Sequence, residues 1–184
     1  MHEQRPHSCI FLLGLHGAGK TTLGRYMEAN HGWRHLSLGD LGRLARSRKL
    51  PREYSVRFMG HLASHPPGER LGKALIESML SEIDHHRQSR VMTIDGFPAE
   101  PYHMDLLPEG SRVVNLIVPD EIRQSRLDQR SQSTARKWTQ PEKPTGRDQD
   151  LPIILERYAA RIYPLNAQSA VPQLAQRLLQ LATS

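Results

Sequence analysis

The sequence predicts a three-layer α/β domain in which a parallel sheet of four or five strands lies between helices. Short runs rich in valine, isoleucine and leucine alternate along the chain with stretches of helical periodicity, and strands that alternate with helices form parallel sheets. The chain of 184 residues has the length of one domain, and its 38% hydrophobic and 24% charged residues are ordinary for a globular protein. We therefore expect a single domain over residues 1–184.

The first half of the chain contains two expected strands, a glycine-rich loop after the first of them, and three expected helices. The apolar run Cys9–Leu13 predicts a strand that ends in this loop, and a helical pattern follows to about residue 30. A second short strand is expected at Arg34–Ser37, after which a basic helix begins and must be interrupted at Pro51. Leucine, methionine and isoleucine at core-facing spacing predict a further helix over 67–86.

The second half continues the alternation. Strands are expected at Arg90–Ile94 and Arg112–Val118, and Pro119 followed by two acidic residues marks the start of a helix that continues to about residue 130. Residues 131–147 are polar, contain two prolines and a glycine, and predict a long mobile loop. Two helices, over about 149–162 and 170–181, complete the expected order.

Charge and composition restrict the possible classes of ligand and location. The net charge is +6, and segments 43–57 and 123–147 each carry five more basic than acidic residues, which indicates a polyanionic ligand such as nucleotide phosphates or a nucleic-acid backbone. The longest apolar run is far shorter than the roughly 18–20 residues that cross a bilayer, and the first residues lack a signal-peptide pattern. With Cys9 as the single cysteine, the chain has no internal disulfide, so we expect a cytoplasmic protein.

The strongest motif is Gly14-x-x-x-x-Gly19-Lys20-Thr21, a phosphate-binding loop between an apolar strand and a helix. Its glycines let backbone N–H groups surround a phosphate, its lysine neutralises phosphate oxygens, and its threonine hydroxyl reaches Mg²⁺. The N-terminus of the following helix adds positive potential. The residues expected to bind the nucleotide are Gly14, Gly17, Ala18, Gly19, Lys20, Thr21 and Thr22.

Three further elements follow this loop in a characteristic order. They are Gly39-Asp40-x-x-Arg43, then Asp95-Gly96-Phe97-Pro98 after an apolar strand, and then a Pro-Asp-Glu helix start followed by Arg126 and Arg130. The combination resembles the adenylate kinase group of nucleoside monophosphate kinases over most of residues 8–165. This resemblance implies a P-loop kinase fold and Mg²⁺-dependent transfer of the ATP γ-phosphoryl group to a nucleoside monophosphate, with two diphosphates as products.

The resemblance also implies roles for individual residues. Lys20 and the arginines at 126, 130 and 147 would stabilise the transferring phosphoryl group, and Arg126 would also contact the donor nucleotide. Thr21, and Asp95 through water, would hold Mg²⁺. A helical region over 43–65 and a lid loop over 131–147 would close over the substrates. The acceptor would be bound by Gly39, Asp40, Arg43, Gly96, Phe97, Pro98 and His103.

The sequence departs from the family pattern at the acceptor site and leaves alternatives open. Ala99 stands where the family has a second arginine for the acceptor phosphate, and His103 stands where a glutamine reads adenine. The glycine loop resembles that of shikimate kinases at least as well as that of adenylate kinases. In a small-molecule kinase of the shikimate or gluconate kinase type, Asp40 would activate an acceptor hydroxyl. A third possibility is a degenerate nucleotide-binding regulator that binds RNA or protein. We expect a monomer that binds ATP, Mg²⁺ and a small acceptor, with neither membrane nor nucleic acid as its partner.

Overall fold

Five parallel strands form the sheet in the described part of the computed structural model, residues 9–133 and 146–183, in the order β2-β3-β1-β4-β5. The predicted α/β class is confirmed, and the sheet has the larger of the two expected strand numbers. The strands are β1 (Cys9–Leu13), β2 (Arg34–Ser37), β3 (Met92–Asp95), β4 (Arg112–Ile117) and β5 (Ile162–Asn166). The helices are α1 (Lys20–His31), α2 (Leu38–Arg46), α3 (Val56–Ser64), α4 (Lys73–His86), α5 (Asp120–Ser133), α6 (Gly146–Arg157) and α7 (Val171–Thr183), with the short turns η1 (Pro101–Leu106) and η2 (Ala159–Arg161).

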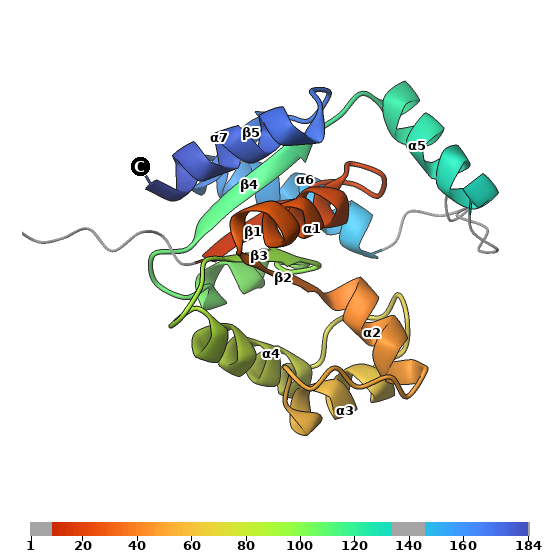
Figure 1. Cartoon of the computed structure of the whole chain (residues 1–184), viewed down its shortest axis with the longest axis vertical. Helices are drawn as coiled ribbons and strands as arrows, with labels where there is room; N and C mark the ends of the chain where they lie inside the picture. Colours follow the sequence, from red (N-terminus) through yellow and green to blue (C-terminus); the bar gives the residue numbers. More distant parts are fainter. Residues whose placement is uncertain (1–8, 134–145, 184) are drawn as a thin grey trace, which may run out of the picture.

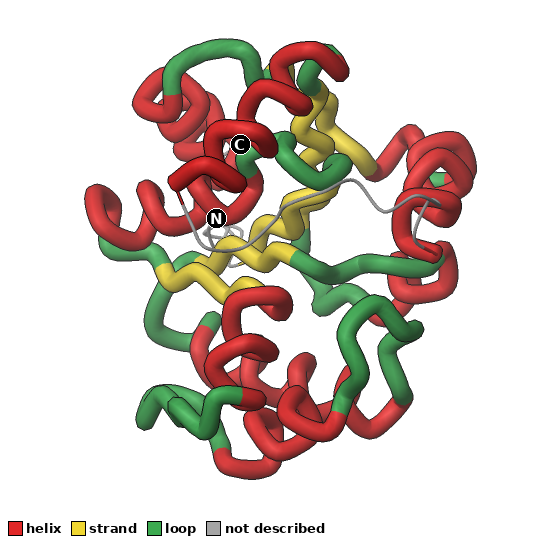
Figure 2. Tube along the Cα trace, turned by 90° about the vertical axis from the view of Figure 1, so that its right-hand side faces the viewer, coloured by secondary structure: helices red, strands yellow, loops and turns green. Residues whose placement is uncertain are grey.

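The central strand β1 is buried along its whole length because helices cover both faces of the sheet. Successive side chains of a strand point to opposite faces, so Ile10 and Leu12 pack with α1 and α7, whereas Phe11 and Leu13 pack with α3, α4 and α6. The strands form a continuous band through the middle of the molecule with helices on either side (Figure 2). The two cores make this a three-layer domain.

The register of the sheet brings several loops to one edge. Asp95 at the end of β3 is paired with Leu12 of β1 and with Ser37 of β2. Because parallel strands end on the same side, the loops that follow β1, β2 and β3 meet there, which is where open α/β sheets bind ligands. Helices α2 and α5 project from this side of the molecule (Figure 1).

The helix predicted over 67–86 begins later than expected. Residues 67–72 precede α4, which starts at Lys73 with Gly72 in extended conformation at its N-cap. Gly68 has a φ of +84°, in the left-handed region, so the chain turns there and does not continue as a helix. The irregular stretch before α4 carries Arg70, whose importance for the site is described below.

The helix predicted over 149–162 is also corrected. Helix α6 ends at Arg157, and residues 162–166 form the edge strand β5 beside β4. Pro164 lies inside this strand and cannot donate a ladder hydrogen bond, which an edge position tolerates. Tyr163 is substantially exposed and Leu165 is buried. A strand that is only partly buried does not need the continuous apolar run by which the inner strands are recognised.

Both ends of the segment 131–147, which was predicted to be a loop, are helical. Helix α5 extends to Ser133, and α6 begins at Gly146, so residues 134–145 of the predicted lid lie outside the described residues. None of the described helices combines the length and the apolar character that a membrane span requires.

Candidate active site

The loop between β1 and α1 adopts the compact shape that the glycine motif predicts. Gly17 has a φ of +83°, and a Cβ atom there would lie 2.8 Å from Cγ and 2.9 Å from the carbonyl oxygen of Arg123 on α5. Gly14 is similarly confined, since its Cβ would meet the carbonyl oxygen of Leu116 at 2.9 Å. These glycines therefore let the loop pass close to β4 and α5.

Lys20 occupies the centre of this loop. Only 7% of its surface is exposed, and its Nζ donates hydrogen bonds to the carbonyl oxygens of Gly14 at 2.7 Å and Leu15 at 3.0 Å. The lysine begins α1, so its charge lies beside the N-terminal N–H groups of that helix. This arrangement places a cation and a helix N-terminus at the same point, which is the electrostatic requirement of a phosphate site.

A hydrogen bond joins Thr21 in the first turn of α1 to Asp95 at the end of β3. The Thr21 hydroxyl donates a 2.6 Å hydrogen bond to Oδ2 of Asp95, which is 7% exposed at the end of β3. A hydroxyl and a carboxylate are oxygen ligands of the kind that Mg²⁺ prefers, directly or through water. Among the described residues no group of three or more histidine, cysteine, aspartate or glutamate side chains forms a metal cage. A divalent ion at this place would accordingly depend on phosphate oxygens and water for its other ligands.

Asp40 on α2 connects two arginines. It forms close ion pairs with Arg25 of α1 and with Arg43 one turn further along α2. Ser37 caps α2 through its hydroxyl, which accepts a 3.4 Å hydrogen bond from the backbone N–H of Asp40. Sequence analysis did not select Arg25, although residues 21 and 25 are four apart and so share one face of α1.

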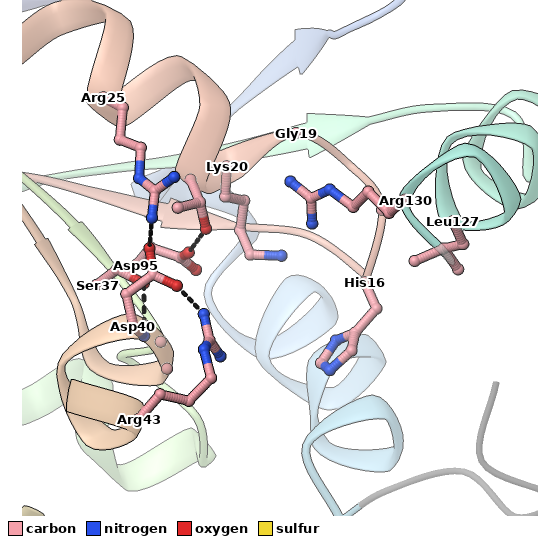
Figure 3. A pocket seen from close by; sticks show the side chains of 14 residues that line it. His16, Gly19, Lys20, Arg25, Ser37, Asp40, Arg43, Asp95, Leu127 and Arg130 are labelled. Carbon is pink, nitrogen blue, oxygen red and sulfur yellow. Dashed lines mark hydrogen bonds and ion pairs between the residues drawn. The ribbon is translucent and has the colours of Figure 1, made fainter. Parts of the chain in front are cut away.

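These groups surround a cavity of about 340 Å³, which we call the P-loop cavity. Lys20, Arg43 and Arg130 approach the same space from three helices (Figure 3). Four cationic side chains and two carboxylates line it, so the cavity has a net positive lining. Its lining residues are His16, Gly17, Gly19, Lys20, Thr21, Arg25, Ser37, Gly39, Asp40, Arg43, Asp95, Gly96, Leu127 and Arg130.

Two arginines of α5 donate hydrogen bonds to residues in and beside the glycine loop. Arg126 donates to the carbonyl oxygens of Ala18 at 3.2 Å and Ala167 at 3.0 Å, and Arg130 donates to the Thr22 hydroxyl at 3.4 Å. Both arginines also line a second cavity of about 510 Å³ between the loop and α7, which we call the α7 cavity. The predicted pair of arginines therefore faces the loop from one side of one helix, as their spacing of four requires.

A third cavity of about 280 Å³, the side cavity, opens beside the P-loop cavity and shares His16, Gly39, Arg43 and Gly96 with it. Its wall contains three residues that sequence analysis missed, namely Arg70, Glu100 and Asp150. They come from the stretch before α4, the loop after β3 and the first turns of α6. No motif joins them in the sequence, and only the fold brings them together.

Several predicted acceptor residues lie behind the cavity walls. Phe97 is completely buried and stacks on His103, with ring centroids 4.6 Å apart. Pro98 follows it through a cis peptide bond. With Gly14 it lines a separate small cavity beside α6. The neighbouring Ala99 does line the side cavity. Arg147 lies in the first turn of α6, and its side chain is outside the described part of the protein.

His103 was expected to contact the acceptor, but it has a structural role instead. Its side chain is fully buried, and Nδ1 accepts hydrogen bonds of 3.1 Å from the backbone N–H groups of Ala99 and Glu100. Burial lowers the pKa of His103 to about 4, because the imidazolium form would be desolvated. His103 thus shapes the loop after β3 as a neutral ring and does not reach either cavity.

The glycine loop, the buried lysine and the Thr21–Asp95 pair at the carboxyl edge of a five-stranded parallel sheet define a P-loop protein of the kinase-like type. The family model described as AAA domain (AAA_18) matches residues 10–151. The chain belongs to this family.

Two known proteins are similar to this chain. Adenylate kinase 9 of Mus musculus is 29% identical over 111 residues, an alignment that covers 59% of this chain and 6% of the mouse protein. The structure of shikimate kinase from Acinetobacter baumannii in complex with shikimate has a TM-score of 0.52 and 21% identity, and the match covers 97% of this chain and 93% of that chain. At this identity the second similarity establishes the fold alone, and the first supports a P-loop kinase-like protein.

Proposed function

We propose that this protein transfers the γ-phosphoryl group of ATP to a nucleoside monophosphate in a Mg²⁺-dependent reaction. The observation that carries the proposal is the connection of the positively lined P-loop cavity to the side cavity through four shared residues. Two substrates bound in adjoining cavities would meet at the point where Lys20, Arg43 and Arg130 converge.

In this reaction an oxygen of the acceptor phosphate attacks the γ-phosphorus, and the bond to the β-phosphate oxygen breaks. ADP and a nucleoside diphosphate leave. The acceptor needs no general base, because the second pKa of a phosphate monoester is about 6 and its oxygens are already largely ionised near neutral pH. Catalysis then depends on alignment and on neutralising the negative charge of the transferring group.

The proposed donor site combines the glycine loop with the α7 cavity. Lys20 and the loop N–H groups would bind the β- and γ-phosphates, Arg126 and Arg130 would neutralise charge from α5, and the base would occupy the α7 cavity. Thr21 and Asp95 would hold Mg²⁺, which supplies neutralisation of the phosphate oxygens. Arg147 and the segment 131–147 are proposed to complete the site as a lid that excludes water.

The proposed acceptor site begins at Arg43, which lines both cavities. Its guanidinium is paired with Asp40, which also holds Arg25. A guanidinium has five N–H donors, so it can bind an acceptor phosphate while it keeps a contact with the carboxylate. We further propose that the protein acts as a monomer in the cytoplasm.

The second candidate is phosphorylation of a hydroxyl on a small molecule. The observation in its favour is that the Asp40 carboxylate lies in the P-loop cavity, where it would accept a proton from an attacking hydroxyl. Both of its oxygens are engaged by arginines, which makes this carboxylate a poor proton acceptor and ranks the hydroxyl reaction second.

The deciding experiment is a product analysis with the pure protein and Mg·ATP. The acceptor panel contains AMP, CMP, GMP, UMP, their deoxy forms, shikimate and gluconate, and products are identified by mass. A nucleoside diphosphate formed from one monophosphate is the expected result. Phosphorylated shikimate or gluconate would replace the proposal with the second candidate, and ATP binding without transfer to any acceptor would favour a regulator that binds RNA or protein.

A further inference from the structure

The wall of the side cavity contains a group of three charged residues from three separate segments. Arg70 forms a close ion pair with Glu100, and its Nη2 lies 3.4 Å from Oδ2 of Asp150. The side chains of Glu100 and Asp150 are only 10% and 12% exposed, whereas that of Arg70 is 67% exposed. Two nearly buried carboxylates therefore share one guanidinium that reaches into solvent.

The charge of this group is unbalanced among the described residues. Two carboxylates and one guanidinium leave one negative charge in a largely dehydrated place, which is unfavourable unless a further donor arrives. His103 stands behind Glu100, with its Nε2 3.9 Å from Oε1. It adds no positive charge, because its Nδ1 accepts two backbone hydrogen bonds and the ring is therefore neutral.

The backbone holds Glu100 in position before any ligand binds. Its side chain accepts a hydrogen bond from the backbone N–H of His103 at the start of η1, and the His103 ring accepts one from the backbone N–H of Glu100. This reciprocal cap joins the carboxylate to a fully buried ring that stacks on Phe97. A carboxylate fixed in this way is preorganised as a hydrogen-bond acceptor.

The remaining walls of the side cavity are suited to a flat ring. Leu38, Leu62 and Leu71 line it together with Pro67 and several glycines. An acceptor whose phosphate is bound beside Arg43 would extend its other end into this cavity. Apolar walls with a few fixed polar groups are typical of sites that bind a ring and read its edge.

We propose that Glu100 and Asp150 read the base of the acceptor nucleotide through its exocyclic amino group, so that the substrate is a monophosphate of cytosine, adenine or guanine. This inference depends on the proposed function. A carboxylate only accepts hydrogen bonds. Cytosine, adenine and guanine each carry an exocyclic amino group, whereas uracil and thymine have carbonyl oxygens at C2 and C4 and a single ring N–H between them. A carbonyl oxygen directed at Glu100 or Asp150 would add no donor beyond Arg70 and would place two acceptors against each other.

The test compares kcat/KM for CMP, AMP, GMP, UMP and dTMP at saturating Mg·ATP. The wild-type protein is expected to prefer its best amino-bearing monophosphate over UMP by at least about tenfold. Glu100→Gln replaces one acceptor oxygen with an amide that donates, so it should reduce this preference about tenfold through the acceptor KM, with the KM of ATP unchanged. Asp150→Asn should act in the same direction.

Glu77→Gln is the matched control, because it makes the same chemical change at an exposed glutamate of α4 that lines none of these cavities. It should leave the base preference unaltered. The wild-type preference is measured without any variant, so it can overturn the inference even if Glu100→Gln fails to fold, which circular dichroism would reveal. Asp150→Asn then tests whether the carboxylates cause the preference. Equal or better use of UMP by the wild type would overturn the inference while leaving nucleoside monophosphate kinase activity intact.

If no monophosphate is phosphorylated, the proposed function fails and a binding measurement still decides the inference. Cytidine, adenosine, guanosine and uridine are titrated calorimetrically into the protein with the donor site filled by Mg²⁺ and a non-hydrolysable ATP analogue. Tighter binding of an amino-bearing nucleoside than of uridine, lost in Glu100→Gln, would support base reading by the carboxylates. Equal binding of all four, or binding of none, would overturn it.

Discussion

The P-loop cavity and the side cavity adjoin each other but differ in charge and in origin. Four cations and two carboxylates line the first, whereas three arginines and three carboxylates line the second. The first is built mostly from short motifs that begin or end at the sheet edge. The second takes its charged group from positions 70, 100 and 150, which no motif connects.

This difference separates two requirements of a phosphoryl-transfer site. Phosphates need concentrated positive charge, which a glycine loop, one helix N-terminus and a few cations provide on any similar fold. Recognition of the uncharged part of a substrate needs a particular set of donors and acceptors at a particular distance. The following experiments test whether the two cavities divide the work in this way.

The largest effect is expected for Lys20→Ala. The Lys20 charge lies at the centre of the P-loop cavity, and its loss should lower kcat about a thousandfold, on the scale of removing a preorganised charge from a transition state. Steady-state kinetics with the acceptor found in the product screen measures it. Lys73→Ala, on the exposed surface of α4, is the control and should keep the normal rate. A Lys20→Ala protein with near-normal turnover would remove the phosphate-loop mechanism.

The next largest effect is expected for the free energy of unfolding at acid pH, because of His103 behind the side cavity. His103 has an ordinary pKa of 6.5 when unfolded and a pKa lowered to about 4 by burial when folded. Between these values the unfolded chain binds more protons, so the free energy of unfolding should fall as the pH drops from about 6.5 to 4, by about 3 kcal/mol in total from this residue. Above pH 6.5 its contribution is fully present.

Urea denaturation at pH 7 and pH 4.5 measures this change. The matched variant is His103→Asn, whose Oδ1 can accept the same backbone hydrogen bonds as Nδ1 but does not titrate. Burial also lowers the pKa of His35, so part of the acid sensitivity should remain in the variant. The same pH dependence in both proteins would show that His103 is not the main source.

A somewhat smaller effect is expected for Asp95→Asn at the P-loop cavity. The carboxylate accepts the 2.6 Å hydrogen bond of Thr21, and its loss should misplace the Mg²⁺ ligands. We expect kcat to fall about a hundredfold and the Mg²⁺ concentration for half-maximal rate to rise. Asp84→Asn on the exposed face of α4 is the control. An unchanged Mg²⁺ requirement would place the metal elsewhere.

The smallest effect is expected for Arg43→Ala, at the junction of the two cavities. The loss of one charged contact to the acceptor phosphate should raise the acceptor KM about tenfold and leave the KM of ATP unchanged. Arg57→Ala, exposed on α3, serves as the control. A change in ATP affinity alone would assign Arg43 to the donor side and contradict the division between the cavities.

Much of the fold was predictable because its signals are local. The apolar runs at β1, β3 and β4 and the glycine motif at residues 14–21 each report a structure formed by neighbouring residues. The edge strand β5 was not predicted, since an exposed edge strand with Pro164 lacks the apolar run of an inner strand. The start of α4 was placed too early because glycines at 68 and 72 were not weighted against the apolar spacing.

The sequence by itself determined the class of the protein and the place of its phosphate loop with Lys20 and Thr21, because the chemistry of phosphate binding requires these residue types at a fixed spacing. The role predicted for Asp95 came from the family resemblance. Only the tertiary structure decided which residues surround the side cavity. It buried His103, which the resemblance had assigned to the acceptor, and it brought Arg70, Glu100 and Asp150 together. A charge cluster assembled from three distant segments depends on how helices pack against a sheet, and no local pattern encodes that packing.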